Sequence, residues 1–201
     1  MSEHYFVENP QAAARRREID VELRGRPLTV ATDSGVFSAA HLDHATRILL
    51  AEAPEPPAGG AALDLGCGWG PIALALAAES PGLDVWAVDV NERALGLTAE
   101  NAQRHGFDRV RAVQPDAVPE DLRFDVIWSN PPIRIGKAAL DELLLGWLPR
   151  LAPEGEAWLV VGKNLGADSL QRRLAESLGD GYSVSRAATS KGFRVLRIAR
   201  G

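Results

Sequence analysis

The chain has 201 residues, 46% of them hydrophobic, which is enough for one α/β domain with a substantial core. Its single cysteine excludes an intrachain disulfide and fits a reducing compartment, and no apolar stretch approaches the roughly 20 residues of a membrane-spanning helix. The net charge of −5 argues against a protein that holds nucleic acid by charge alone. Because the N-terminus is polar and lacks a signal-peptide pattern, we expect a cytoplasmic protein.

Residues 1–60 are predicted to form an N-terminal arm, a hairpin and a helix that cover the site. Apolar residues alternate over 19–32 in the manner of two strands, with a turn at 25–27. A helical pattern extends over about 43–53. Residues 54–60 are rich in proline and glycine and are typical of a linker.

A glycine-rich turn follows this linker and joins a strand to a helix. The apolar run at 62–65 is followed by three glycines at alternate positions from Gly66 to Gly70, and a helical pattern begins at Pro71. This order is typical of a nucleotide-binding βαβ unit, in which glycines let the backbone approach a ligand closely. The spacing differs from the NAD fingerprint, and the phosphate-binding loop of nucleoside triphosphatases is absent from the sequence, so neither cofactor is supported.

Acidic residues follow the next two predicted strands. Asp89 comes directly after a strand at 84–88, and an acid at this distance from the glycine turn usually accepts hydrogen bonds from ribose hydroxyls. Asp116 follows a strand at 109–113, although a plain Pro-Asp turn is an alternative interpretation. Since ligands bind at the carboxyl ends of parallel strands, we expect these acids and Asp64 to share one edge of the sheet.

Two prolines end the next strand. The apolar residues 124–129 are followed by Asn130-Pro131-Pro132-Ile133. Proline has no N–H for a sheet ladder and its φ is fixed near about −65°, so the strand must end at Ser129 in a stiff, extended turn. Carbonyl oxygens beside the Asn130 amide suit the binding of an NH₂ group, while an asparagine that only caps the turn is the alternative.

The remaining pattern completes a doubly wound fold. The predicted elements are a helix at 137–148, a strand at 156–161, a helix at 168–178, and strands at 182–188 and 193–199. The connection between the last two strands is so short that only an antiparallel hairpin fits. We therefore predict an α/β, Rossmann-like, doubly wound, mostly parallel seven-stranded sheet with an antiparallel last strand.

These motifs together resemble the class I S-adenosylmethionine (SAM) dependent methyltransferases. Within that class the chain is most similar to the small-domain amino-methyltransferases of the 16S ribosomal RNA guanine-N2 type. The resemblance is carried by residues 64–70, Asp89, Asp116 and 130–133, and it extends upstream to two segments, 35–38 and 43–50, that the family places beside SAM and substrate. The glycine turn is common to all SAM methyltransferases, whereas the Asn-Pro-Pro motif implies methylation of a planar amine.

The resemblance implies specific site residues, with SAM as the cofactor. The implied cofactor-binding residues are Asp64, Gly66, Cys67, Gly68, Asp89, Val90, Asp116 and Asn130. The implied catalytic residues are Asn130, Pro131, Pro132 and Ile133, and the expected substrate-binding residues are Phe37, Arg134, Lys137 and Lys191. Residues 61–201 would then be the SAM-binding catalytic domain. We expect no metal, because the histidines lack the spacing of metal ligands.

Ribosomal RNA or the small ribosomal subunit is the partner that the resemblance implies, and the basic residues after the strands favour it. Arg134, Lys137, Lys163 and Lys191 are expected on the catalytic edge as a basic rim, although ordinary surface cations are an alternative. Two departures from the family also leave alternatives open. Ile133 stands where nucleic-acid enzymes usually have an aromatic residue, and the chain has one methyltransferase-like half where some members have two.

Three functional hypotheses follow. The first is methylation of the exocyclic N2 of guanine in small-subunit ribosomal RNA. The second is N-methylation of protein glutamine or of a small amine, and the third is a SAM-binding module without catalysis. Under the first two, the Asn130 side-chain oxygen and the Pro131 carbonyl would each accept one N–H of the amine.

Overall fold

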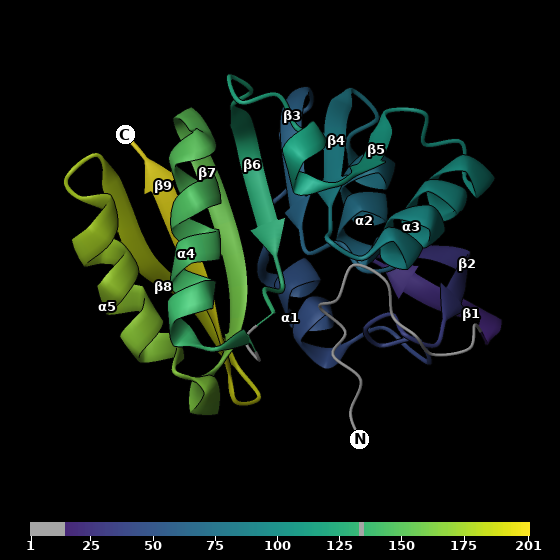
Figure 1. Cartoon of the computed structure of the whole chain (residues 1–201), viewed down its shortest axis with the longest axis horizontal. Helices are drawn as coiled ribbons and strands as arrows, with labels where there is room; N and C mark the ends of the chain where they lie inside the picture. Colours follow the sequence, from purple (N-terminus) through teal and green to yellow (C-terminus); the bar gives the residue numbers. More distant parts are fainter. Residues whose placement is uncertain (1–14, 133–134) are drawn as a thin grey trace.

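The computed structural model describes residues 15–132 and 135–201, which form a central sheet with helices around it and a separate hairpin (Figure 1). The strands of the sheet are β3 (Gly60–Leu65), β4 (Leu83–Val88), β5 (Val110–Val113), β6 (Phe124–Ser129), β7 (Leu151–Gly162), β8 (Tyr182–Ser190) and β9 (Phe193–Arg200). Their order is β5-β4-β3-β6-β7-β9-β8, and β9 is antiparallel to both of its neighbours. The predicted fold class is therefore confirmed.

Helices cover both faces of this sheet. They are α1 (His44–Glu52), α2 (Pro71–Glu79), α3 (Glu92–Arg104), α4 (Lys137–Trp147) and α5 (Ala167–Leu178). One core contains Ile48 of α1, Leu74 of α2 and Leu97 of α3, and a second core contains Leu144 of α4 and Leu170 of α5. Figure 1 shows α4 and α5 side by side over β7, β9 and β8. Because both faces are covered, most side chains of the central strands β3 and β6 are buried instead of alternating between buried and exposed.

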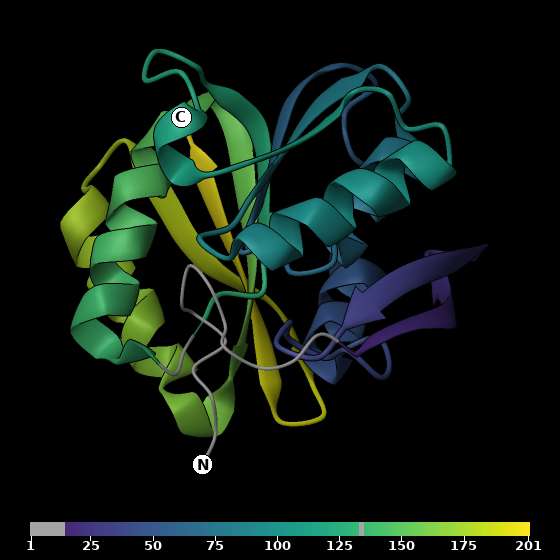
Figure 2. The ribbon, with the colours of Figure 1, turned by 45° about the vertical axis from the view of Figure 1, so that its right-hand side comes forward.

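The N-terminal hairpin consists of β1 (Arg16–Leu23) and β2 (Arg26–Asp33), and in Figure 2 it lies below α3. Two predicted details are corrected. The first strand begins at Arg16, before the predicted residue 19, because Arg16 pairs with Asp33 at the open end of the ladder. The turn is Arg24-Gly25, with φ of 50° and 79°, because a two-residue hairpin turn needs the left-handed region. Residues 26 and 27 already belong to β2.

Asn101 of α3 joins this hairpin to the glycine turn. Its amide accepts a hydrogen bond from Ala31 N at 2.7 Å, and its amide nitrogen donates to Ala31 O at 2.9 Å and Trp69 O at 3.0 Å. The first core also contains Leu23 of β1 together with side chains of α2 and β4. Residues from 1–60 and from 61–201 thus share one core, and the predicted domain division at residue 60 stays a prediction.

Strand β7 is longer than the predicted 156–161. It starts at Leu151, which pairs with Phe124, and the register with β6 then shifts before Glu156 pairs with Val126. The shift is made by Glu154, with φ of 64°, and by Gly155, where a Cβ would come within 2.9 Å of the Ala152 carbonyl oxygen. Such a bulge breaks the apolar pattern, which explains why the first part of the strand was missed.

Candidate active site

The glycine turn after β3 lies at the carboxyl edge of the sheet. Gly66, Gly68 and Gly70 have φ of 80°, 58° and 92°, values that a residue with a side chain rarely adopts. Gly66 N donates to Val88 O at 2.8 Å, which ties the turn to the end of β4. A Cβ on Gly66 would lie 3.9 Å from Cδ of Pro132. The glycine turn and the Asn-Pro-Pro segment therefore lie next to each other.

Asp64 at the end of β3 is fully buried under this turn. Its Oδ2 accepts a hydrogen bond from Ala73 N at 2.9 Å, whereas its Oδ1 has no hydrogen-bond partner within the part of the chain that the structure describes. Burial, together with a smaller effect of the nearby Asp89 carboxylate, raises the pKa of Asp64 to about 8, although the hydrogen bond from Ala73 N lowers it. A buried acid with an unused oxygen fits a ligand that brings positive charge or a hydrogen-bond donor.

Asp89 follows β4 and holds the glycine turn in place. Its Oδ2 accepts from Gly68 N at 3.0 Å and its Oδ1 accepts from Asn91 N at 2.9 Å, while burial raises the pKa of the carboxyl. A carboxylate has further lone pairs, so these contacts leave room for ribose hydroxyls, and the ribose role of Asp89 stays a prediction. The neighbouring Val90 side chain is 44% exposed.

Cys67 and Thr98 fill the space behind the turn. The Cys67 side chain is buried, and burial raises the pKa of its thiol well above the usual value. Thr98 of α3 donates to Gly68 O at 3.0 Å and lies 3.6 Å from the Cys67 sulfur. A neutral, buried thiol is a poor nucleophile, so the Cys67 side chain packs behind the turn rather than reacting.

Asn130 lies at the carboxyl end of β6 against the first turn of α1. Its Nδ2 donates to Asp43 Oδ2 and to Thr46 Oγ1, both at 3.0 Å. Ser129, just before it, donates to Leu65 O at 2.6 Å and so fixes the end of β6 beside β3. Both amide hydrogens of Asn130 are engaged, whereas its amide oxygen has no hydrogen bond to another residue among 15–132 and 135–201. Pro131 is buried and Pro132 is half-buried.

Three of the predicted substrate residues, Phe37, Lys137 and Lys191, lie within the described part of the chain, on three different segments. Phe37 is 44% exposed, and the Val36 side chain before it packs toward Gly68. Lys191 is exposed in the β8–β9 turn, which lies at the carboxyl end of β7 because Lys163 N donates to Gly192 O at 2.8 Å. Lys137 is exposed at the start of α4. Ile133 and Arg134 lie outside the described residues.

Among the predicted cofactor-binding residues, Asp116 follows the strand that lies farthest from β3, at the edge of the sheet. It is exposed in the short helix η1 (Pro115–Ala117) after β5, and β4 separates β5 from β3 and its glycine turn. The structure thus brings Asp64, Asp89 and Asn130 together around the glycine turn, with Asp116 at the outer end of the same edge. The site roles of all these residues remain predictions.

Several residues of this centre were not predicted to have a role in the site. Asp43 and Thr46 contact Asn130, and Asn91 donates to Gly35 O at 3.1 Å. Asp43 and Asn91 both precede helical patterns and are recognisable as caps in the sequence. Their second contacts are made across the fold and leave no local signal.

Within residues 15–132 and 135–201, no group of three or more His, Cys, Asp or Glu side chains is placed to hold a metal ion. A membrane-crossing helix is likewise not found in these ranges.

Comparisons of the sequence with known proteins identify the family. Residues 27–197 match the family described as Methyltransferase small domain. A Bacillus subtilis protein, YbxB, described as uncharacterized, is 36% identical over the full length of both chains. Ribosomal RNA large subunit methyltransferase G of Streptomyces avermitilis is 31% identical over 89% of this chain and 46% of that protein.

A solved structure extends the match to three dimensions. The T. thermophilus 16S rRNA N2-guanine methyltransferase, in complex with AdoMet and guanosine, matches 96% of this chain and 52% of that chain, with a TM-score of 0.78 and 25% identity. The chain thus spans about half the length of the two named enzymes and the whole length of YbxB. The predicted resemblance and enzyme class are confirmed: the chain belongs to the methyltransferase small domain family and is a SAM-dependent methyltransferase.

Proposed function

We propose that this methyltransferase modifies the exocyclic N2 amine of guanine in small-subunit ribosomal RNA. The observation that carries the proposal is the match of 96% of the chain, at a TM-score of 0.78, to an enzyme named for that reaction and bound to guanosine. The Asn130-Pro131-Pro132 segment independently supports an amine as the acceptor. The S. avermitilis relative is named as a methyltransferase of large-subunit ribosomal RNA. The experiment therefore also tests which ribosomal subunit carries the target.

The residues around the glycine turn fit SAM. Three glycines with positive φ allow close approach of a ligand to the backbone, and Asp64 supplies a buried oxygen without a partner among the described residues. SAM supplies a methyl group that its sulfonium has already activated. Asp64 and Asp89 would provide negative charge for this cationic cofactor, which is consistent with the raised pKa of both carboxyls in its absence.

The Asn130 segment would hold and activate the amine. The lone pair of an exocyclic amine is delocalised into its ring, and two acceptors on its N–H groups favour a geometry in which the lone pair is available. We assign these acceptors to the Asn130 side-chain oxygen and the Pro131 carbonyl. As nitrogen bonds to the methyl carbon, that carbon would part from the sulfonium sulfur, which leaves as a neutral thioether. Positive charge would develop on nitrogen, and the same oxygens would stabilise that charge. The cationic product then loses a proton to water without a strong base.

Positioning is the main contribution of the protein in this scheme. Pro131 and Pro132 restrict the backbone next to Asn130, and alignment of two reactants can be worth roughly 7–11 kcal/mol of a reaction barrier. A guanine inside a helical stack must first leave that stack to reach the site. Single-stranded or looped RNA is therefore the expected form of the target.

The test is transfer of labelled methyl from SAM. Small subunits, large subunits, free ribosomal RNA and ribosomal protein are incubated separately with the chain, and the labelled product is digested and identified by mass spectrometry. The proposal predicts N2-methylguanosine in small-subunit RNA, with no label when the chain is omitted. Label on a ring carbon, on a ribose oxygen or only in protein would contradict it.

A further inference from the structure

The Asn130 amide is fixed by acceptors from a distant part of the chain. Asp43, the N-cap of α1, lies 87 residues before Asn130, and Thr46, in the first turn of α1, lies 84 residues before it. Each accepts a hydrogen bond from Nδ2 at 3.0 Å. An amide NH₂ has two hydrogens, so this pair of acceptors uses both. The direction in which the Asn130 oxygen points is thus decided by α1 rather than by the Asn-Pro-Pro segment itself.

The two acceptors are not equivalent. A threonine hydroxyl both donates and accepts, so Thr46 tolerates either orientation of the amide. An ionised carboxylate only accepts, so a reversed amide would place the Asn130 oxygen against Asp43 Oδ2 with no proton between them. Asp43 therefore selects the orientation, and Thr46 strengthens it.

The same Asp43 oxygen also caps α1. Oδ2 accepts a hydrogen bond from Thr46 N at 3.0 Å, which is the usual bond of a helix N-cap. The far end of α1 is held by Arg24, which donates to Leu50 O and, at 2.9 Å, to Ala53 O. With Leu49 fully buried, α1 is a fixed support rather than a loose cover.

We infer that Asp43 is a positioning residue for methyl transfer. Together with Thr46 it holds the Asn130 amide with its nitrogen toward α1 and its oxygen toward the amine of the substrate. The inference rests on the proposed function, because it assumes an amine that donates to the Asn130 oxygen. A reversed amide would present N–H to N–H and would repel the substrate.

Two variants separate this role from helix capping. Asp43→Ser keeps a good N-cap residue but shortens the side chain that reaches Asn130. Thr46→Val keeps the shape of the side chain and removes the acceptor. Thr29→Val is the matched control, because Thr29 donates to Asp20 at 2.7 Å in an exposed Thr–Asp pair of the hairpin. Asp43→Asn is the conservative variant, since its amide oxygen can replace Oδ2.

The kinetic readout is kcat alongside SAM affinity by calorimetry. We expect kcat to fall about tenfold in Asp43→Ser, the factor expected when one hydrogen bond of ordinary strength no longer selects the amide orientation, and to fall less in Thr46→Val, because Thr46 accepts either orientation of the amide. SAM affinity and the urea midpoint should stay near wild type, Asp43→Asn should recover most of kcat, and Thr29→Val should match wild type. Wild-type kcat in Asp43→Ser would overturn the inference, whatever the result for Thr46→Val.

A second readout does not need a substrate. The ¹H–¹⁵N signals of the Asn130 side chain are assigned by their loss in Asn130→Ala, and we expect slow hydrogen exchange in wild type and faster exchange in Asp43→Ser. Equal exchange in both proteins would show that Asp43 does not hold the amide. Failure of the proposed function is distinguishable, because a wild-type chain that methylates no amine would still show this difference in exchange.

Discussion

At the scale of single residues, Asp64 is the most unusual group of the site. It is buried beneath the glycine turn, uses only one oxygen within the described chain, and has a pKa raised to about 8 by burial. In the folded protein without cofactor it is therefore largely protonated at neutral pH. Ionisation would be favoured by a cation, which links the charge state of Asp64 to cofactor binding.

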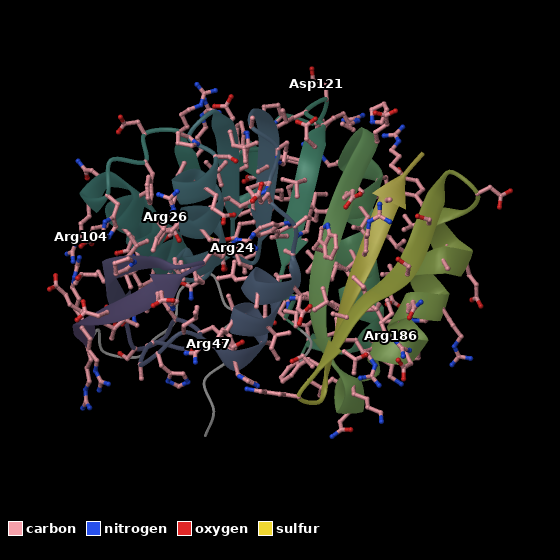
Figure 3. The ribbon with its side chains drawn as sticks, turned by 180° about the vertical axis from the view of Figure 1, so that it is seen from behind. Arg24, Arg26, Arg47, Arg104, Asp121 and Arg186 are labelled. Carbon is pink, nitrogen blue, oxygen red and sulfur yellow. The ribbon has the colours of Figure 1, made fainter. Side chains whose placement is uncertain are left out.

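We predict that Asp64 makes the free energy of unfolding depend on pH. The folded pKa of about 8 lies above the ordinary value of 3.8, so the stability contributed by the protonated acid is complete below about pH 4 and is lost as pH rises to about 8. Urea unfolding between pH 5 and 8 should show wild type losing stability relative to Asp64→Asn, by up to about 1.4 kcal/mol per pH unit. The exposed Asp121, labelled in Figure 3, provides the control variant Asp121→Asn. Parallel curves for wild type and Asp64→Asn would contradict the prediction.

At the scale of elements, the caps and strand ends were predictable and the contacts between elements were not. The start of α3 after Asn91 and the end of β6 at Ser129 follow from a capping residue and from two prolines. The bond from Asn130 to Asp43 joins residues 87 positions apart, and no local pattern encodes it. The bulge in β7 was missed for a related reason, because it depends on pairing with Phe124.

Asn91 provides a test at this scale. Its Oδ1 accepts from Arg93 N at 3.0 Å as the N-cap of α3, and its Nδ2 donates to Gly35 O in the segment before α1. We expect Asn91→Ala to lower the free energy of unfolding by about 1–3 kcal/mol, because it removes a cap and leaves a carbonyl unpaired. Asn91→Ser keeps the cap and should lose less. Equal stability of Asn91→Ala and wild type in urea unfolding would show that this junction is not needed.

At the scale of the whole molecule, an acidic protein carries exposed lysines near the candidate site. The net charge is −5, yet exposed Lys137, Lys163 and Lys191 lie near the carboxyl edge of the sheet. Figure 3 shows Arg47, also exposed, on the lower part of the molecule, where this edge lies. Cations at these positions would attract RNA phosphates toward the site.

We predict that Lys137→Gln and Lys191→Gln each weaken binding to ribosomal RNA without changing SAM affinity. Each phosphate contact that is lost should reduce the slope of log affinity against log salt by about 0.7–0.9. Arg123→Gln is the control, because Arg123 is exposed beside the amino end of β6, at the opposite edge of the sheet. Fluorescence anisotropy over a salt series measures the slopes. Identical slopes for wild type and both lysine variants would argue for a substrate other than RNA.

The most direct test of the account is Asn130→Ala, measured in two ways on the same preparation. The account predicts that SAM affinity by calorimetry stays near wild type while kcat for the amine falls by about 10²–10³, as when one preorganised hydrogen-bonding group is removed from a reaction centre. Turnover at the wild-type rate would show that Asn130 does not hold the amine. Loss of SAM binding in proportion to the loss of activity would place Asn130 in the cofactor site alone and would contradict the central claim.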